Sequence, residues 1–123
     1  MTTSASRQAL GAYGEDVAAR YLVQAGMVLL DRNWRCPEGE IDLVLRDGDT
    51  LVVAEVKTRS GVAFGHPFEA LTAAKLARLR RLANAWRVAH PEHGRLRRIR
   101  IDAVAVLAPR DAPASVEHLS GVF

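Results

Sequence analysis

The stretch GEIDLVLRDGDTLVVAEVKTR, residues 39–59, decides the fold of this chain. Two β-rich apolar runs flank an Asp-Gly-Asp step at residues 47–49. Such a step predicts a hairpin, because Asp and Gly tolerate the backbone angles of a tight turn. Side chains alternate between the two faces of a strand. Closing the hairpin at this turn therefore places Asp42 opposite Glu55, with Lys57 one step further along the same face.

Two carboxylates that face each other across a hairpin repel, so this arrangement needs a source of positive charge. Opposite Cβ atoms lie about 4.5–5.5 Å apart, which is close enough for both carboxylates to hold one cation. The same register pairs Val44 with Val53, and it sets Glu40 opposite Lys57. The charge is therefore offset either by a metal ion or by Lys57. A solvated sheet face that carries an ion pair stays open as an alternative.

The composition is that of one globular domain. The chain has 123 residues, of which 49% are hydrophobic and 25% charged. We expect a flexible tail at residues 1–8 and a single domain at residues 9–123. The net charge of +3 is compatible with an anionic partner. Cys36 is the only cysteine, so an intrachain disulfide is excluded and a cytoplasmic location is expected, and no apolar run is long enough to span a membrane.

Hydrophobic periodicity and turn residues predict an α/β fold, a mixed sheet flanked by helices with the order α-β-β-β-α-β and a further short strand. The expected elements are a helix at 9–25, a strand at 27–34, the hairpin of 39–59, a helix at 68–89, a strand at 99–107 and a short strand at 116–119. The glycine-rich segment 60–67 is expected to be a mobile connection, with His66 in a structural role.

Two charged side chains stand out against the helical pattern. Glu15 lies at the flank of the apolar stripe of the first helix rather than on its wet side. Lys75 falls inside the apolar arc of the second helix. Each has an ordinary explanation, since Glu15 can be solvated and Lys75 can extend its amine past apolar neighbours. The alternative is that both side chains reach one site beside the sheet.

A basic run precedes the late strand. The candidate nucleic-acid contacts are Arg95, Arg97, Arg98 and Arg100 in this run and Arg59 at the end of the hairpin. Clustered arginines are the electrostatic footprint expected of a protein that contacts a nucleic-acid backbone. Ordinary solubilising charge explains the same run and stays open.

Residues spread along the chain also form an ordered set. They are Gly14-Glu15, Asn33, Gly39-Glu40-Ile41-Asp42-Leu43, Glu55-Val56-Lys57 with Arg59, Phe64-Gly65, Glu69-Ala70 with Lys75, and Ile101-Asp102. From about Gly11 to Phe123, the chain resembles the YraN-like family (UPF0102). That family looks like a branch of the restriction-endonuclease-like PD-(D/E)XK nuclease superfamily, and the layout is similar to that of archaeal Holliday-junction resolvases. One departure is Ile41, which precedes Asp42 where the superfamily's name has proline.

The resemblance implies a restriction-endonuclease-like fold and a function. The function is that of a metal-dependent endonuclease that hydrolyses phosphodiester bonds in DNA, with branched or flap structures as candidate substrates. The expected partner is nucleic acid and not a membrane, and a homodimer is compatible because nucleases that cut both strands often work as dimers. The alternative is a nucleic-acid-binding or partner-docking module that keeps the fold without catalysis. A protein adaptor with a solvated hairpin face is a third option.

The site implied by the resemblance is a set of acids with one lysine. Asp42 and Glu55 would bind the metal, and Glu15 would be an additional acidic ligand. Lys57 would position or activate the attacking water. Two auxiliary candidates complete the set, Glu40 and Lys75. Mg²⁺ or Mn²⁺ suits such a site, because hard cations prefer carboxylate oxygen and lower the pKa of a bound water. Nearby anions favour a protonated Lys57, so it would orient hydroxide more than act as a free base.

Overall fold

The computed structural model describes residues 4–61, 65–94 and 96–122. Three parts of the sequence-based expectations lie outside these ranges. They are the first three residues of the predicted tail, Phe64 of the motif set and Arg95 of the basic run.

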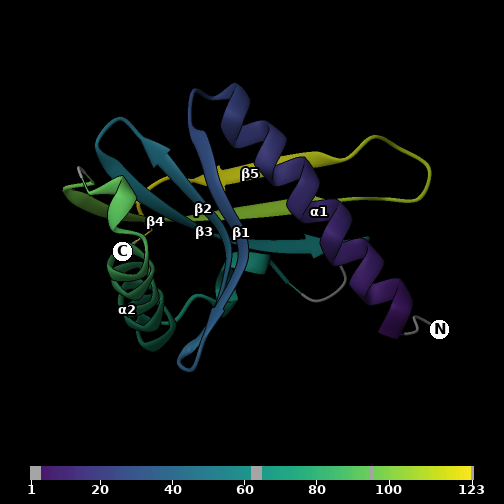
Figure 1. Ribbon diagram of the computed structural model, residues 1–123. Coiled ribbons are helices and arrows are strands. Elements are labelled where there is room, and N and C mark those ends of the chain that lie inside the picture. The colour runs from purple at the N-terminus through teal and green to yellow at the C-terminus, as the bar shows by residue number, and fades with distance from the viewer. Residues whose placement is uncertain (1–3, 62–64, 95, 123) are drawn as a thin grey trace.

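The described residues form one five-stranded sheet, two α-helices and two short 3-10 helices (Figure 1). In chain order the elements are α1 (Ser4–Gln24), β1 (Val28–Cys36), β2 (Gly39–Asp47), β3 (Thr50–Arg59), η1 (Pro67–Ala70), α2 (Ala73–Ala89), η2 (Pro91–His93), β4 (Arg98–Leu107) and β5 (Ser115–Leu119). The strands lie in the order β1-β2-β3-β4-β5, and β3 and β4 are parallel whereas the other pairs are antiparallel. The predicted mixed α/β fold is confirmed, including the short last strand.

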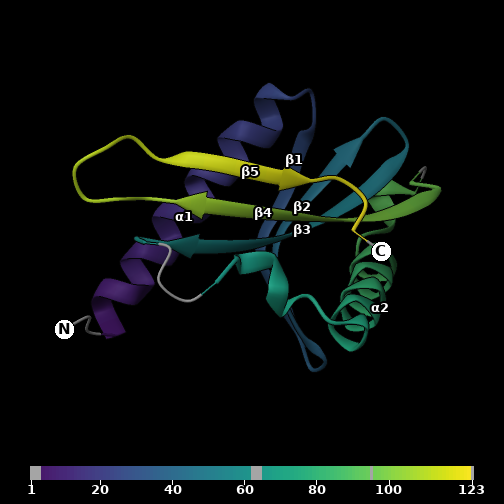
Figure 2. The ribbon, with the colours of Figure 1, turned by 180° about the vertical axis from the view of Figure 1, so that it is seen from behind.

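Each face of the sheet packs against one helix. α1 crosses in front of the strands in Figure 1 and behind them in Figure 2. It buries Ala18 and Leu22 against alternate residues of the sheet, Leu43, Leu45, Val52, Ala54, Val104 and Val106. On the other face α2 buries Leu82 and Trp86 against the intervening residues, Ile41, Val44, Leu51, Val53 and Ile101. In the described residues, neither helix combines the length and the hydrophobicity that a membrane span requires.

The first helix begins earlier than the sequence pattern indicated. α1 starts at Ser4, so it includes five residues of the predicted tail and precedes the expected start at Ala9. Residues 6–9 are exposed, so they carry no amphipathic pattern that periodicity could detect. Alanine, arginine and glutamine are nevertheless good helix formers, and this segment contains neither glycine nor proline.

The predicted helix of residues 68–89 is wrong in its first turn. The 3-10 helix η1 ends at Ala70, and α2 starts only at Ala73. Thr72 between them is the N-cap of α2, because its Oγ1 accepts a hydrogen bond of 3.1 Å from the backbone N of Lys75. This break places Lys75 in the first turn of α2, which determines where its side chain can reach.

Candidate functional site

The hairpin register is confirmed near the turn and is wrong further along. Val44 pairs with Val53 as predicted, but the ladder between β2 and β3 ends at Leu43 and Ala54. The expected pairing of Asp42 with Glu55 is therefore not part of the ladder. Beyond this point β2 continues to pair with β1 while β3 continues with β4, so the sheet splits between its second and third strands.

The side chain of Asp42 bridges β2 and β3 where the two strands separate. Its Oδ2 accepts a hydrogen bond of 2.8 Å from the backbone N of Val56, which replaces a missing bond of the ladder. The alternation of faces also breaks here, because Ile41 packs on the α2 side although Leu43 packs on the α1 side. The carboxylate of Asp42 is thus fixed to β3 by a side-chain bond rather than by strand pairing.

Glu55 is held between two ammonium groups. Its side chain is 12% exposed, and Lys75 Nζ lies 3.0 Å from Glu55 Oε1. Lys57 Nζ lies 3.9 Å from the same oxygen. The interpretation that Lys75 leaves its apolar arc to meet the sheet carboxylates is confirmed. A single oxygen of Glu55 therefore contacts both candidate lysines.

The position of Lys75 is unfavourable for α2 itself. The first turn of a helix favours negative charge because of the helix dipole, yet this turn of α2 has no acidic residue and carries Lys75 instead. The ion pair with Glu55 offsets this cost. The lysine is thus better explained by the carboxylate beside it than by helix stability.

Glu15 reaches the same region from α1. Asn33 of β1 forms a side-chain hydrogen bond with Glu15, and Arg32 Nη2 lies 3.9 Å from Glu15 Oε1. Asn33 has a φ of +52°, a left-handed conformation that asparagine tolerates better than most residues. Burial raises the pKa of Glu15, and the Asn33 bond and the Arg32 charge only partly oppose this effect. The site role of Asn33 was missed at the sequence level, where its tolerance of positive φ was the available signal.

The acids of this region act on one another. Burial and the charge of Glu55 raise the pKa of Asp42 to about 7, against the lowering effect of the Val56 hydrogen bond. The charges of Glu15 and Glu40 make smaller contributions to this rise in the pKa of Asp42. Glu40 lies at the rim, where Arg35 Nε is 3.4 Å from its Oε2, so its observed partner is Arg35 rather than Lys57. Glu15 and Glu40 are paired with Arg32 and Arg35, so the strongest repulsion between acids in the site is that between Asp42 and Glu55.

The donor set suits a hard cation, although the described residues contain no ready-made group of three or more Asp, Glu, His or Cys side chains for one. Asp42 and Glu55 supply carboxylate oxygens, the ligands that Mg²⁺ and Mn²⁺ prefer. The ammonium of Lys75 lies against Glu55 where a cation would bind, so Lys75 must move aside for one. Glu15 could complete the set directly or through a water.

The backbone of α1 lies close against β3 at Gly14. Gly14 is buried, and a Cβ at this position would lie 2.6 Å from Cγ2 and 2.7 Å from Cβ of Thr58. Gly11 is in the turn before and has open space in the same place. The absent side chain of Gly14 therefore brings Glu15 next to the strand that carries Glu55 and Lys57.

Gly14→Ala is expected to lower the free energy of unfolding by about 1–3 kcal/mol, because overpacking pushes α1 away from Thr58. Gly11→Ala is the matched control, and it should raise the same quantity by about 0.5–1 kcal/mol because alanine favours a helix where space is open. Urea denaturation of both variants measures the difference. Effects of the same sign would contradict this contact.

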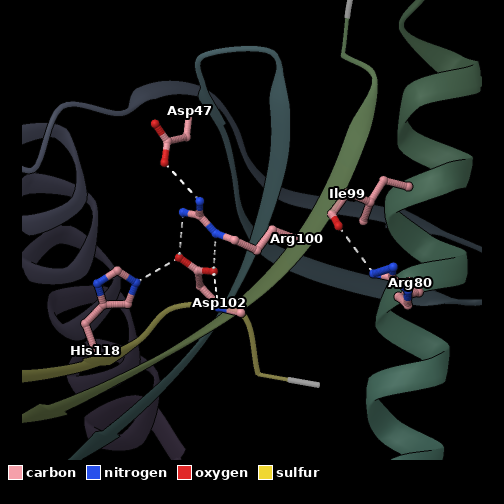
Figure 3. Close-up of polar contacts among 7 residues, drawn as sticks. Asp47, Arg80, Ile99, Arg100, Asp102 and His118 are labelled. Carbon is pink, nitrogen blue, oxygen red and sulfur yellow. Dashed lines mark hydrogen bonds and ion pairs between the residues drawn. The ribbon is translucent and has the colours of Figure 1, made fainter.

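Part of the basic run has a structural role. Arg100 Nε donates to Asp102 Oδ1 at 2.8 Å, and its Nη1 donates to Asp47 Oδ2 at 2.9 Å (Figure 3). Asp102 is fully buried, and it also lies 2.8 Å from His118 Nε2 and accepts a 3.0 Å bond from the backbone N of Gly121. Arg100 and Asp102 thus join β4 to the β2–β3 turn, to β5 and to the chain after it.

The remaining described arginines of the candidate nucleic-acid surface differ in exposure. Arg97 and Arg98 are exposed at the start of β4, and Arg59 is half-buried at the end of β3. Arg100 is committed to internal ion pairs, so it does not offer a free cation to a phosphate. The described part of the basic run therefore has fewer arginines available to contact a nucleic acid than the sequence suggests.

Comparison with known proteins gives the family of the chain. Residues 14–106 match the model of the family described as "Uncharacterised protein family UPF0102". The chain is 60% identical over 117 residues to a UPF0102 protein of Beutenbergia cavernae, covering 95% of this chain and 98% of the relative. It is 58% identical over 125 residues to a UPF0102 protein of Nocardioides sp., covering 99% of each. A UPF0102 protein of Kineococcus radiotolerans is 56% identical over 117 residues, covering 95% of each. The chain belongs to the UPF0102 family.

Proposed function

We propose that this protein is a metal-dependent nuclease of the PD-(D/E)XK superfamily. It hydrolyses phosphodiester bonds in DNA, with branched or flap structures as candidate substrates. The observation that carries the proposal is the crowding of acids at the split between β2 and β3. There Asp42 is fixed by Val56, and burial and Glu55 raise its pKa to about 7. A divalent cation relieves such crowding.

Each residue of the site has a role that follows from its position. Asp42 and Glu55 would hold the ion, with Glu15 as a further ligand direct or through water. When bound, the ion would lower the pKa of the attacking water and neutralise charge on the phosphate. Lys57 is partly exposed and lies 3.9 Å from Glu55 Oε1, so its ammonium can orient the water between the acids and a phosphate. Lys75 keeps Glu55 neutralised when the ion is absent.

A cleavage assay tests this proposal. Purified protein is incubated with single-stranded, duplex, flap and four-way DNA in Mg²⁺ or Mn²⁺, and again in EDTA. We expect cleavage of at least one substrate. This cleavage should require metal, and it should fall by about 10²–10³-fold in Lys57→Met, the loss typical of removing one group that stabilises charge in the transition state. Arg78→Gln, an exposed change on α2, is the control. No cleavage of any substrate, or unchanged cleavage by Lys57→Met and Asp42→Ala, would refute the enzymatic function.

A second candidate is a nucleic-acid-binding module without catalysis. It is favoured by the ion pair between Lys75 and Glu55, which already neutralises one of the two principal acids. Such a module should bind DNA in EDTA with an affinity that falls steeply with salt, because binding releases counterions from the phosphates. Metal-dependent cleavage that is lost in Lys57→Met would reject this candidate.

A further inference from the structure

A pocket lies beside the candidate site, where β3, β4 and β5 come together. Its volume is about 340 Å³, and its lining includes Arg59, His66, Ala105, Leu107, Val116 and Glu117. Known small-molecule sites have volumes from about 300 Å³ upward, so this pocket is large enough for one compact ligand. None of the roles assigned above to the acids or to Lys57 uses it.

The strand register places this pocket on the same face of the sheet as the catalytic lysine. Lys57 pairs with Ala105 across the parallel strands, and Arg59 pairs with Leu107. Ala105 in turn pairs with Glu117 of β5. Residues paired across adjacent strands share a face, so the face that carries Lys57 continues over β4 to β5. Arg59 follows Lys57 by two positions, about 7 Å along the strand.

Arg59 brings an unsatisfied donor to the pocket. Its Nε is buried and has no hydrogen-bond partner among the residues that the structure describes. A buried donor without an acceptor is costly, and the cost is greater for a charged group. The planar guanidinium presents donors that match the oxygens of a phosphate. Because Nε is buried, the guanidinium must turn toward the pocket before an anionic ligand there can supply the missing partner.

The remaining lining gives the ligand an apolar half. Ala105 and Leu107 supply aliphatic surface on the face that carries Lys57. His66 is fixed at the rim, because its Nδ1 accepts a bond from the backbone N of Phe68 and its Nε2 lies 2.8 Å from Glu117 Oε2. This contact holds the Glu117 carboxylate at the rim beside the imidazole. A ligand with a phosphate for Arg59 and a flat apolar group that lies over the strands would fit both the charged and the apolar part of the pocket.

We propose that this pocket binds one nucleotide of the substrate strand, with its phosphate on Arg59 and its base on the aliphatic surface of β4. The spacing of Arg59 from Lys57 lets this nucleotide flank the phosphate that is cut. The flanking position rests on the proposed nuclease function. The nucleotide site itself stands on the pocket, its lining and the unsatisfied guanidinium.

Binding of small ligands tests the site without any cleavage. The whole chain in EDTA is titrated with 2′-deoxyadenosine 5′-monophosphate (dAMP), with 2′-deoxyadenosine and with inorganic phosphate, and amide NMR shifts report where each binds. We expect dAMP to bind more tightly than either of its parts and to shift the amides of Ala105 and Leu107. Arg59→Gln keeps most of the aliphatic part of the side chain. It should weaken the binding of dAMP by about tenfold or more, because a charged hydrogen bond is lost.

Two further variants complete the design. Glu117→Gln removes a carboxylate from the rim and should therefore make dAMP bind more tightly. This variant keeps the test decisive if Arg59→Gln folds poorly. Arg78→Gln, outside the pocket lining, should change nothing. Equal binding of dAMP by wild type, Arg59→Gln and Glu117→Gln would overturn the nucleotide site, as would dAMP binding no tighter than phosphate. A single-stranded oligonucleotide in a parallel titration separates a free nucleotide from one in a strand, and Arg59→Gln must weaken it too.

The cleavage assay separates this inference from the proposed function. Metal-dependent cleavage with the same KM in wild type and Arg59→Gln would overturn the nucleotide site and leave the nuclease standing. Binding of dAMP that depends on Arg59, in a protein that cuts no DNA, would support the nucleotide site and overturn the nuclease.

Discussion

Asp42→Asn is expected to stabilise the folded protein at neutral and alkaline pH by about 4 kcal/mol, because each unit of pKa shift corresponds to about 1.4 kcal/mol. The pKa of Asp42 is raised from 3.8 to about 7 by burial and by the charge of Glu55. The folded state therefore binds this proton more tightly than the unfolded state does. Its stabilising effect is complete below about pH 4 and is lost as the pH rises through 7. The amide of the variant carries no charge and can still accept the bond from Val56.

Urea denaturation at pH 5 and pH 8 measures this effect. The advantage of Asp42→Asn over wild type should be large at pH 8 and small at pH 5. Asp111→Asn, at an exposed position after β4, is the control and should show little dependence on pH. Saturating Mg²⁺ at pH 8 should stabilise wild type but not Asp42→Asn, because a ligand stabilises only the protein that binds it. A variant that is less stable than wild type at pH 8 would contradict this account of the site.

Asp102→Ala is expected to lower the free energy of unfolding by about 3–5 kcal/mol, the usual cost of breaking a buried ion pair by removing one partner. Burial alone would raise the pKa of Asp102, but bonds from Arg100, Gly121 and His118 outweigh it and hold that pKa below its ordinary value. The carboxylate thus contributes stability above about pH 4, and this contribution is lost as the pH falls below its folded pKa. Without it, three donors lose their shared acceptor.

Chemical denaturation at pH 7 compares Asp102→Ala with Asp47→Ala. Asp47 bonds the same Arg100 guanidinium, but its side chain is 46% exposed, so its loss should cost less than about 1 kcal/mol. This pair of variants separates the buried acceptor from the surface ion pair. Equal costs would contradict the assignment of Asp102 as the centre of the network.

The sequence predicted those features that local rules control. Turn residues and alternation gave the hairpin and its register as far as Leu43, and the irregular placement of Lys75 in its helix indicated the ion pair with Glu55. The split at Asp42 was not predictable in this way. It arises because β3 keeps β4 as its partner beyond the point where β2 leaves it, and that pairing joins parts of the chain separated by a whole helix.

The same limit explains Arg100 and Asn33. Counting arginines assigned Arg100 to a nucleic-acid surface. Asp102 lies two positions along the same strand and on the same face, a local signal that the count left out, whereas Asp47 is brought to Arg100 only by the fold. Asn33 was part of the ordered set that carries the family resemblance, but no role was predicted for it, because its contact with Glu15 exists only when α1 lies against β1. Partners brought together by tertiary packing leave no periodic signal in the sequence.

The one parallel strand pair has a consequence for how the chain folds. Strands β1, β2 and β3 are joined by tight turns, whereas Thr50 pairs with Arg98 only after η1, α2 and η2 have been traversed. Closing so long a loop costs more chain entropy than closing a hairpin, so we expect the antiparallel strands to form first. Until β4 arrives, the apolar edge of β3 from Leu51 to Ala54 is an open template for another chain. Refolding at high concentration should therefore compete with aggregation through this edge, and the acids of the site should meet before β4 is in place.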